Sequence, residues 1–247
     1  MNRTVYTVAS GGMAALARLE SVAQNLANVG TAGYKAERLL FRVRPLTTEP
    51  RALLDPVLGE TAAQVTEVAT IRDFSPGPIR LSGNPLDVAI AGQGFFTVTT
   101  PRGERYTRQG SFTRDAGGYL ATQHGERVQG DGGDILLGEG EVAIGEDGTV
   151  TVDGAPAGRV KLVTFGDPPA LVPEGGALFA PARGAVPAPL DAAETRLQPG
   201  ALEAANVDAV AGLVELVDVA RGFESYMHAL ARLDEVAQRG ITEVGRI

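Results

Sequence analysis

Apolar residues recur at alternating spacings of three and four at both ends of the chain. Near the N-terminus the pattern spans residues 4–28, and its positions are Val5, Ala9, Gly12, Leu16, Leu19, Ala23 and Leu26. Near the C-terminus it spans residues 208–239, and its positions are Leu213, Leu216, Ala220, Phe223, Met227, Leu230, Asp234 and Ala237. Such spacing is the a/d heptad seam of a helix that packs on another helix, and it is narrower than the stripe of a helix on a globular core. The sequence therefore predicts one helix at each end of the chain.

The ends of both predicted helices carry typical stop and start signals. Gly30 and Gly33 supply a glycine-based turn after the first helix. Asn206 and Asp208 are both suitable N-caps for the second helix, whose heptad phase continues to Val244. The two seams can pair with each other, with other copies of the chain, or with both, and the simplest alternative is an intramolecular pair lying on the central body. Asp234 is the only polar break in the second seam and is a position that can set register.

Between the helices the hydrophobic pattern changes to period 2, which is typical of strands. Leu86, Val88 and Ile90 alternate with other residues up to Gly92, and a second run covers residues 95–99. Further apolar runs lie at 142–144, 150–152 and 160–165, and Gly-, Pro- and Asp-containing turns separate them every 8 to 12 residues. This spacing predicts an antiparallel all-β body.

The fold class that follows is α+β, mainly β: a glycine-rich antiparallel β body flanked by N- and C-terminal helices that pair in a coiled-coil-like manner. Two proline-rich stretches, residues 45–59 and 168–189, read as connecting segments. The predicted division is an N-terminal assembly helix with its following loop (1–35), an extended linker (36–80), the β body (81–199) and a C-terminal assembly helix (200–247).

Composition and charge exclude several classes of partner. The formal net charge of −8 disfavours nucleic acid, because an acidic surface repels phosphate backbones. No window of 18 consecutive apolar residues is present, so no membrane-spanning helix is expected. Thr4 to Ala17 is a poor imitation of a signal peptide, and no cleaved signal is expected. The chain has no cysteine, which excludes disulfides and thiolate metal sites.

Candidate chemistry is sparse. The two histidines, His124 in a predicted turn and His228 on the C-terminal helix, are both expected at the surface, and two isolated imidazoles do not make a zinc site or a nucleophilic triad. Gly92-Gln93-Gly94 lacks the third glycine and the following helix of a dinucleotide site, so we interpret it as a turn between strands. We therefore expect no catalytic, cofactor-binding or metal-binding residues, no cofactor and no small-molecule substrate.

Residues 25–35 (NLANVGTAGYK) follow the pattern N-L-A-N-x-x-T-x-G-[YF]-[KR]. They are the first of five motifs, in order along nearly the whole chain, that resemble those of the flagellar rod, hook and hook-associated axial proteins. Residues 86–96 (LDVAIAGQGFF) resemble the L-D-V-A-I-x-G-x-G-F-F strand pair, and residues 106–118 resemble Y-T-R-x-G-x-F-x-x-D-x-x-G. Residues 200–207 and 221–224 resemble G-x-L-E-x-S-N-V and R-x-[FY]-E, with Ala205 in place of the usual serine.

This resemblance implies a subunit of the flagellar basal-body rod, located in the periplasm and exported without a cleaved signal peptide by the flagellar type III apparatus. Its implied partners are other copies of itself, neighbouring rod proteins and that export apparatus. Length favours the two long rod types, and the lack of a Q-x-G-x-G-V motif between Gly59 and Gly83 favours the proximal over the distal type. A soluble β-rich hydrolase is the alternative from another class.

The seams and the signature together predict an assembly interface. Its residues are Val5, Leu16, Leu19, Asn25, Leu26, Asn28, Gly33, Tyr34, Leu213, Leu216, Phe223, Met227, Leu230 and Asp234.

Overall fold

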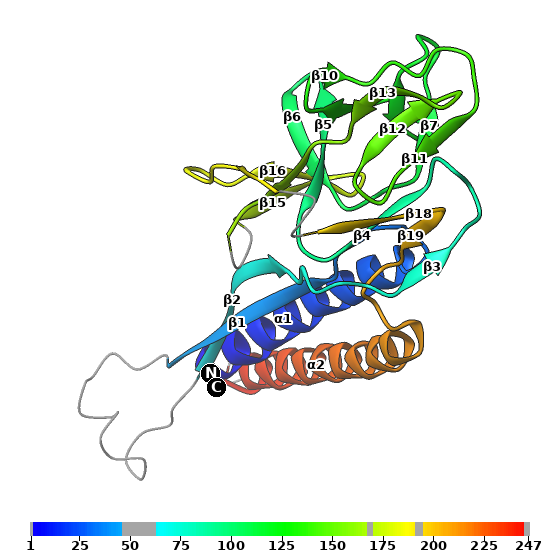
Figure 1. Ribbon diagram of the computed structural model, residues 1–247. Coiled ribbons are helices and arrows are strands. Elements are labelled where there is room, and N and C mark those ends of the chain that lie inside the picture. Colours follow the sequence, from blue (N-terminus) through cyan, green and yellow to red (C-terminus); the bar gives the residue numbers. More distant parts are fainter. Residues whose placement is uncertain (1, 46–62, 167–169, 191–194, 245–247) are drawn as a thin grey trace. The chain divides into compact units, whose positions relative to one another are not determined.

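A computed structural model of the chain describes residues 2–45, 63–166, 170–190 and 195–244 (Figure 1). The described chain forms two compact units. The helical unit comprises residues 1–27, 37–73 and 208–247, and the β unit comprises residues 28–36 and 74–207. Neither unit is continuous in sequence, because the chain passes between them after residues 27, 36, 73 and 207.

The helical unit contains two helices and a two-stranded sheet. Helix α1 spans Asn2–Ala27 and helix α2 spans Ala209–Val244, while β1 (Glu37–Pro45) pairs antiparallel with β2 (Ala63–Arg72). The register runs from Glu37 opposite Arg72 to Pro45 opposite Ala63, with a bulge at Leu40/Phe41. The helices lie side by side and run in opposite directions (Figure 1). None of the described helices is sufficiently long and apolar to cross a bilayer.

The helix boundaries agree with the sequence signals. Asp208 is the N-cap of α2, because its Oδ1 accepts hydrogen bonds from the amides of Val210 (2.9 Å) and Ala211 (3.0 Å). The turn after α1 is closed by a hydrogen bond from the Thr31 amide to the Asn28 carbonyl. Gly33 lies in this turn with φ +68°, a conformation that side chains with a Cβ rarely adopt.

The β unit is built from short antiparallel strands. Ten of them form the largest sheet, whose main path is β15-β16-β6-β5-β9-β8-β7, with β10, β14 and β17 attached at its sides. Three smaller sheets pair β11-β12-β13, β18-β4 and β19-β3. The strands are β3 (Ile79–Leu81), β4 (Val88–Ala91), β5 (Phe95–Thr100), β6 (Gly103–Thr107), β7 (Phe112–Arg114), β8 (Leu120–Thr122), β9 (Arg127–Gly130), β10 (Gly133–Asp134), β11 (Val142–Ile144), β12 (Thr149–Val152), β13 (Ala155–Arg159), β14 (Leu162–Thr164), β15 (Leu171–Gly175), β16 (Leu178–Pro181), β17 (Ala188–Pro189), β18 (Arg196–Pro199) and β19 (Ala201–Glu203).

Two apolar clusters form the core of the β unit. The larger one collects the inward residues of the alternating strands, among them Val88, Phe96, Phe112 and Leu120. The smaller one is aromatic: Phe95, Tyr106, Phe165 and Phe179 pack edge to face around Val163. The mainly β, two-helix architecture predicted from periodicity is confirmed.

The structure differs from the sequence interpretation in two segments of the chain. The difference at the N-terminal side concerns the expected extended linker 36–80, which contains β1, β2 and β3, with β1 and β2 paired. The first proline-rich stretch itself is not tested, because residues 46–59 lie outside the described residues. The second stretch contains β15, β16 and β17, and Leu178 and Phe179 of β16 are buried. Prolines sit at the ends and edges of these strands, where a missing amide donor costs little, so the proline content did not exclude strand.

Candidate assembly interface

One face of α1 packs against the β1–β2 sheet within the helical unit. Ser10 Oγ accepts a hydrogen bond from the Val65 amide at 3.2 Å. Asn25 makes a reciprocal pair with the Glu37 backbone, donating from Nδ2 to the carbonyl and accepting from the amide, both at 2.8 Å. Asn25, predicted as an interface residue, therefore ties α1 to β1 within the chain.

The contact between the two helices is built on small residues. A Cβ added to Gly11 would lie 2.6 Å from Cε1 of Tyr226, and one added to Gly12 would lie 3.5 Å from Tyr226 Cβ. Further along the pair, Arg18 Nη2 reaches Glu215 Oε1 at 2.6 Å. Because both of these side chains are about half exposed, this ion pair contributes only about 0–1 kcal/mol. Gly11 and Gly12, which have no Cβ, leave room for the side chain of Tyr226 to lie against α1.

We expect Gly11→Ala to destabilise the helix pair, whereas Gly222→Ala stabilises it. Both changes add about 0.5–1 kcal/mol of helix propensity. A Cβ at Gly222 meets no atom within 4 Å, whereas a Cβ at Gly11 must displace the ring of Tyr226. Thermal unfolding followed by far-ultraviolet circular dichroism should show midpoints that move in opposite directions. Equal increases in both variants would contradict the proposed contact.

The large heptad residues are not buried in this structure. Val5, Leu16, Leu213, Met227 and Asp234 are exposed. The partly buried ones are Leu19, Leu26, Leu216, Phe223 and Leu230. The buried positions among the described helix residues are Ser10, Gly11, Gly12, Ser21 and Val22 on α1 and Val219 on α2, and of these only Gly12 belongs to a heptad seam. The helices pair side by side, but the seam-to-seam packing of a coiled coil is not what the structure shows within one chain.

This arrangement leaves large apolar side chains in solvent on both helices. Val210, Leu213, Val214 and Val217 are exposed at the first turns of α2, with spacings i, i+3, i+4 and i+7 that place them on one side of the helix. We refer to these four residues as the apolar stripe. On α1, Tyr6 and Met13 are also exposed, Met13 to 73%. Large apolar side chains exposed at helical spacing are typical of interaction surfaces.

A groove of about 820 Å³ lies within the helical unit. Its walls are mainly small or aliphatic, with Ala14 and Ala15 from α1, Phe41 from β1, Val65 from β2 and Val219 from α2. Charged groups from both helices also line it, namely Arg18, Glu215 and Asp218. The helical unit therefore carries both a protruding apolar stripe and an apolar recess with charged groups at it.

The signature residues lie in a second place, in the β unit. Gly33 donates its amide to the Glu203 carbonyl at 2.7 Å, and a Cβ at Gly33 would lie 2.4 Å from the Arg108 backbone. Tyr34 is buried, and its carbonyl accepts a hydrogen bond from the Asn206 amide. Asn28 Oδ1 accepts a hydrogen bond from Thr31 Oγ1. In the structure Asn28, Gly33 and Tyr34 make contacts within the chain.

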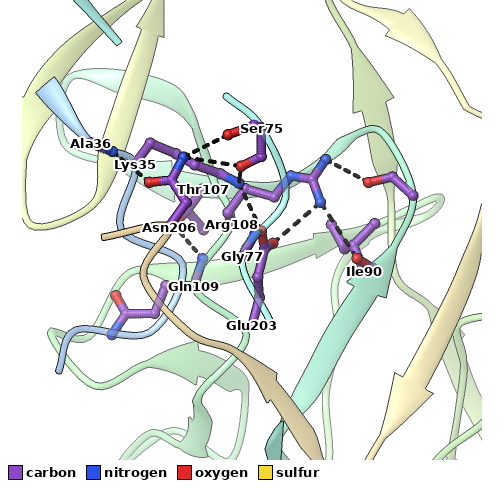
Figure 2. A network of polar contacts seen from close by, with 11 residues as sticks. Lys35, Ala36, Ser75, Gly77, Ile90, Thr107, Arg108, Gln109, Glu203 and Asn206 are labelled. Atoms are coloured by element: carbon purple, nitrogen blue, oxygen red, sulfur yellow. Dashed lines mark hydrogen bonds and ion pairs between the residues drawn. The ribbon is translucent and has the colours of Figure 1, made fainter. Parts of the chain in front are cut away.

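The same region holds a buried ion cluster (Figure 2). Lys35 Nζ lies 2.7 Å from Glu203 Oε1, and each side chain is only 1% exposed. Arg108 Nη1 lies 3.3 Å from Glu203 Oε2. Two further donors reach backbone carbonyls, Lys35 Nζ that of Ser75 at 2.8 Å and Arg108 Nη2 that of Gly92 at 2.8 Å, whereas the buried Arg108 Nε has no hydrogen-bond partner among the described residues. The single carboxylate is thus shared by two buried cations.

Hydrogen bonds extend the cluster to neighbouring segments (Figure 2). The Gly77 amide donates to Glu203 Oε1 at 2.8 Å. Asn206 accepts from the Ala36 amide at 2.7 Å and donates from Nδ2 to the Ser75 carbonyl and hydroxyl, both at 3.1 Å. Burial lowers the pKa of the Arg108 guanidinium, and attraction to Glu203 opposes that shift. We call this set the junction network; it comprises Lys35, Ala36, Ser75, Gly77, Arg108, Glu203 and Asn206.

The sequence interpretation did not identify two pairs of residues that the structure makes important. Tyr226 and Val219 mediate the helix contact, and the adjacent glycines Gly11 and Gly12 were the sequence signal for a close helix neighbour. Glu203 and Arg108 form part of the sequence motifs, but the sequence did not indicate that they form an ion pair. Both histidines are exposed, as predicted. Within the described residues no group of three or more His, Cys, Asp or Glu side chains is placed to hold a metal ion.

Comparison with known proteins places the chain in a class. The family described as "Flagellar hook protein FlgE/F/G D1 domain" matches residues 89–152, which lie in the β unit. The family described as "Flagellar basal body rod FlgEFG protein C-terminal" matches residues 198–243, which include Glu203 and α2. The class is therefore that of the flagellar axial proteins.

Relatives that align over nearly their whole length identify the family within this class. The chain is 33% identical to the flagellar basal-body rod protein FlgF of Caulobacter vibrioides over 100% of both chains. It is 33% identical to FlgF of Escherichia coli over 97% of both chains, and 31% identical to the rod protein FlgG of Agrobacterium fabrum over 95% of this chain and 97% of that one. The chain belongs to the family of flagellar basal-body rod proteins, and the comparison supports the FlgF type, with FlgG as the alternative. It is a structural component of the basal body and serves motility.

Proposed function

We propose that this chain polymerises through its terminal helices into the rod that transmits motor torque around the export channel. The observation that carries the proposal is the apolar surface of the helical unit: four large aliphatic side chains at helical spacing stand in solvent on α2. Removing such a surface from water contributes about 25 cal/mol per Å², so its exposure in a single chain indicates a partner.

The stripe and the groove suggest how copies contact one another. A stripe on one copy that enters the groove of another makes a heterologous contact, since the stripe and the groove lining share only Val214 and otherwise consist of different residues. Heterologous contacts that do not close into a ring generate an open helical array, which a rod requires. The predicted interface residues on the helices, such as Leu213 and Met227, belong to this assembly surface, while Asn25, Asn28, Gly33 and Tyr34 support it from within the chain.

The partners that follow are other copies of the chain, other rod proteins and the flagellar type III export apparatus that delivers them. The place of action is the periplasmic part of the basal body, reached without a cleaved signal peptide, and the role is structural rather than catalytic. The proximal position in the rod is favoured, because the matches at 33% identity are FlgF proteins. The order of rod proteins in isolated basal bodies, determined by labelling this subunit, distinguishes the proximal from the distal position.

Concentration dependence tests the proposal directly. We expect the full chain to sediment as larger species as its concentration rises from about 1 to about 100 µM, the range in which a modest apolar interface associates. Sedimentation velocity measures this. A chain that remains monomeric throughout, both alone and when mixed with other rod proteins, would contradict assembly through the helices.

A further inference from the structure

All four passages of the chain between its two units leave the β unit beside the junction network. Ala36 is the last residue before the second passage, Ser75 follows the third by one residue, and Asn206 precedes the fourth by one residue. The first passage enters the turn of residues 28–33, whose last residue donates its amide to the Glu203 carbonyl. The network therefore has residues at three of the four points at which the β unit connects covalently to the rest of the chain, and the turn that follows the remaining point is hydrogen-bonded to the backbone of Glu203.

The chemistry of the network is unlike that of an ordinary core. The two carboxylate oxygens of Glu203 bind three segments at once, through Lys35, the Gly77 amide and Arg108. Asn206 binds two of these segments again through Ala36 and Ser75. Buried ionic groups are costly to desolvate, and apolar residues of the same volume would stabilise the fold at least as well. What the charged groups provide is a set of directional contacts that hold particular backbone positions.

We propose that the junction network transmits force between segments of the β unit. It fixes the spacing of the four segments at which the chain leaves this unit, which we call the exits, so that force entering through one exit is shared by all four. This inference rests on the proposed function for the origin of the force, since a subunit of a torque-transmitting rod must carry load between its parts. Lys35, Arg108, Glu203 and Asn206 are the positioning residues of the network, with Glu203 at its centre.

Hydrogen exchange on the purified full chain tests the network independently of any rod. In Glu203→Gln, the amides of Gly33, Ala36 and Gly77 should exchange at least about tenfold faster, because opening of the exits no longer requires opening of the β unit. The amides of Val88 and Leu120, which bond to Gly110 and Ile135 in the body, should stay within about twofold of the parent chain. Lys161→Met, which removes the exposed ion pair with Glu104, is the control and should change none of these amides.

A second variant keeps the test decisive if Glu203→Gln does not fold. Asn206→Ala removes the bonds to Ala36 and Ser75 without leaving a buried charge unpaired, and the Ala36 amide should again exchange about tenfold faster. An equal increase in exchange rate at the exits and in the body would show that the network contributes only to general stability. Unchanged exchange rates at the exit amides would show that the network does not hold the exits in place. Either result overturns the proposal.

Swimming under load tests the mechanical role in cells that carry the variant as their only copy. We expect Asn206→Ala and Glu203→Gln cells to assemble flagella and to swim normally in dilute medium, but to lose speed more steeply than Lys161→Met cells as viscosity rises. An unchanged dependence on viscosity, with faster exit exchange, overturns the transmission of force by the network. Failure of the parent protein to enter rods at all would instead refute the proposed function, while the exchange result on the purified chain would stand.

Discussion

Replacing Gly110 with alanine is expected to remove a large part of the folding free energy of the β unit. Gly110 lies where two motifs of the chain touch: an added Cβ would sit 1.7 Å from the Val88 carbonyl oxygen and 3.2 Å from Phe96 Cε2. The Val88 amide also donates to the Gly110 carbonyl at 2.9 Å, so neither backbone can move without breaking this bond. Overpacking in a core costs typically 1–3 kcal/mol, and a backbone obstacle places the expected loss at about 3 kcal/mol.

Urea unfolding of the full chain measures this loss as a decrease in the midpoint at constant slope. The matched control is Gly132→Ala, where a Cβ meets no atom within 4 Å and φ is not in the left-handed region. That variant should be neutral or gain up to about 1 kcal/mol from the reduced entropy of the unfolded chain. Similar midpoints for the two variants would refute the close approach of Gly110 to Val88.

Replacing Leu213 and Val217 together with aspartate is expected to abolish motility while leaving the single chain folded. The two side chains are 51% and 49% exposed, so the charges are largely solvated in the free chain. They lie near the N-terminal end of α2, where negative charge is favoured, and the monomer should lose no more than about 1 kcal/mol. In the assembled rod the same carboxylates would be buried without partners, which costs several kcal/mol for each contact.

Soft-agar motility, sedimentation and the thermal midpoint together measure this second prediction. The control is Val186→Asp, which adds one charge at a 79% exposed aliphatic position that belongs to the β unit and is distant in sequence from both helices. Control cells should swim. Normal swimming by the double variant would show that the apolar stripe is not an assembly surface, and a large drop in its thermal midpoint would show that the stripe belongs to the core of the chain.

Much of the fold could be predicted because its signals are local. Asp208 caps α2 as its residue type suggests, and α2 is helical over the whole described range to Val244, as the heptad phase predicts. The apolar run that predicted a strand at residues 95–99 corresponds to β5 (Phe95–Thr100). At β4 the strand starts at Val88 rather than Leu86, because Asn84 and Pro85 form a turn in which Asn84 accepts hydrogen bonds from the Leu86 and Asp87 amides.

What could not be predicted depends on pairing between distant segments. A heptad pattern states which residues share a face of a helix, but it does not state which neighbour covers that face; here the β1–β2 sheet and Tyr226 contact α1, and Leu16 remains exposed. The junction network is similar. Lys35 and Glu203 are 168 residues apart, and no spacing rule joins a lysine in a turn to a glutamate in a strand at that distance.

The antiparallel pairing of α1 and α2 also determines when the helical unit can form. Arg18 and Glu215, which meet across the pair, are 197 residues apart. At synthesis rates of about 5–20 residues per second, α1 waits on the order of 10–40 s for its partner to be made. The helical unit therefore has a high contact order and is the last part of the chain to be completed, whether the chain emerges from a ribosome or is threaded N-terminus first through a narrow channel. A chain interrupted anywhere before α2 can place α1 on the β1–β2 sheet but lacks the other half of the helix pair, so only a finished molecule can form that pair.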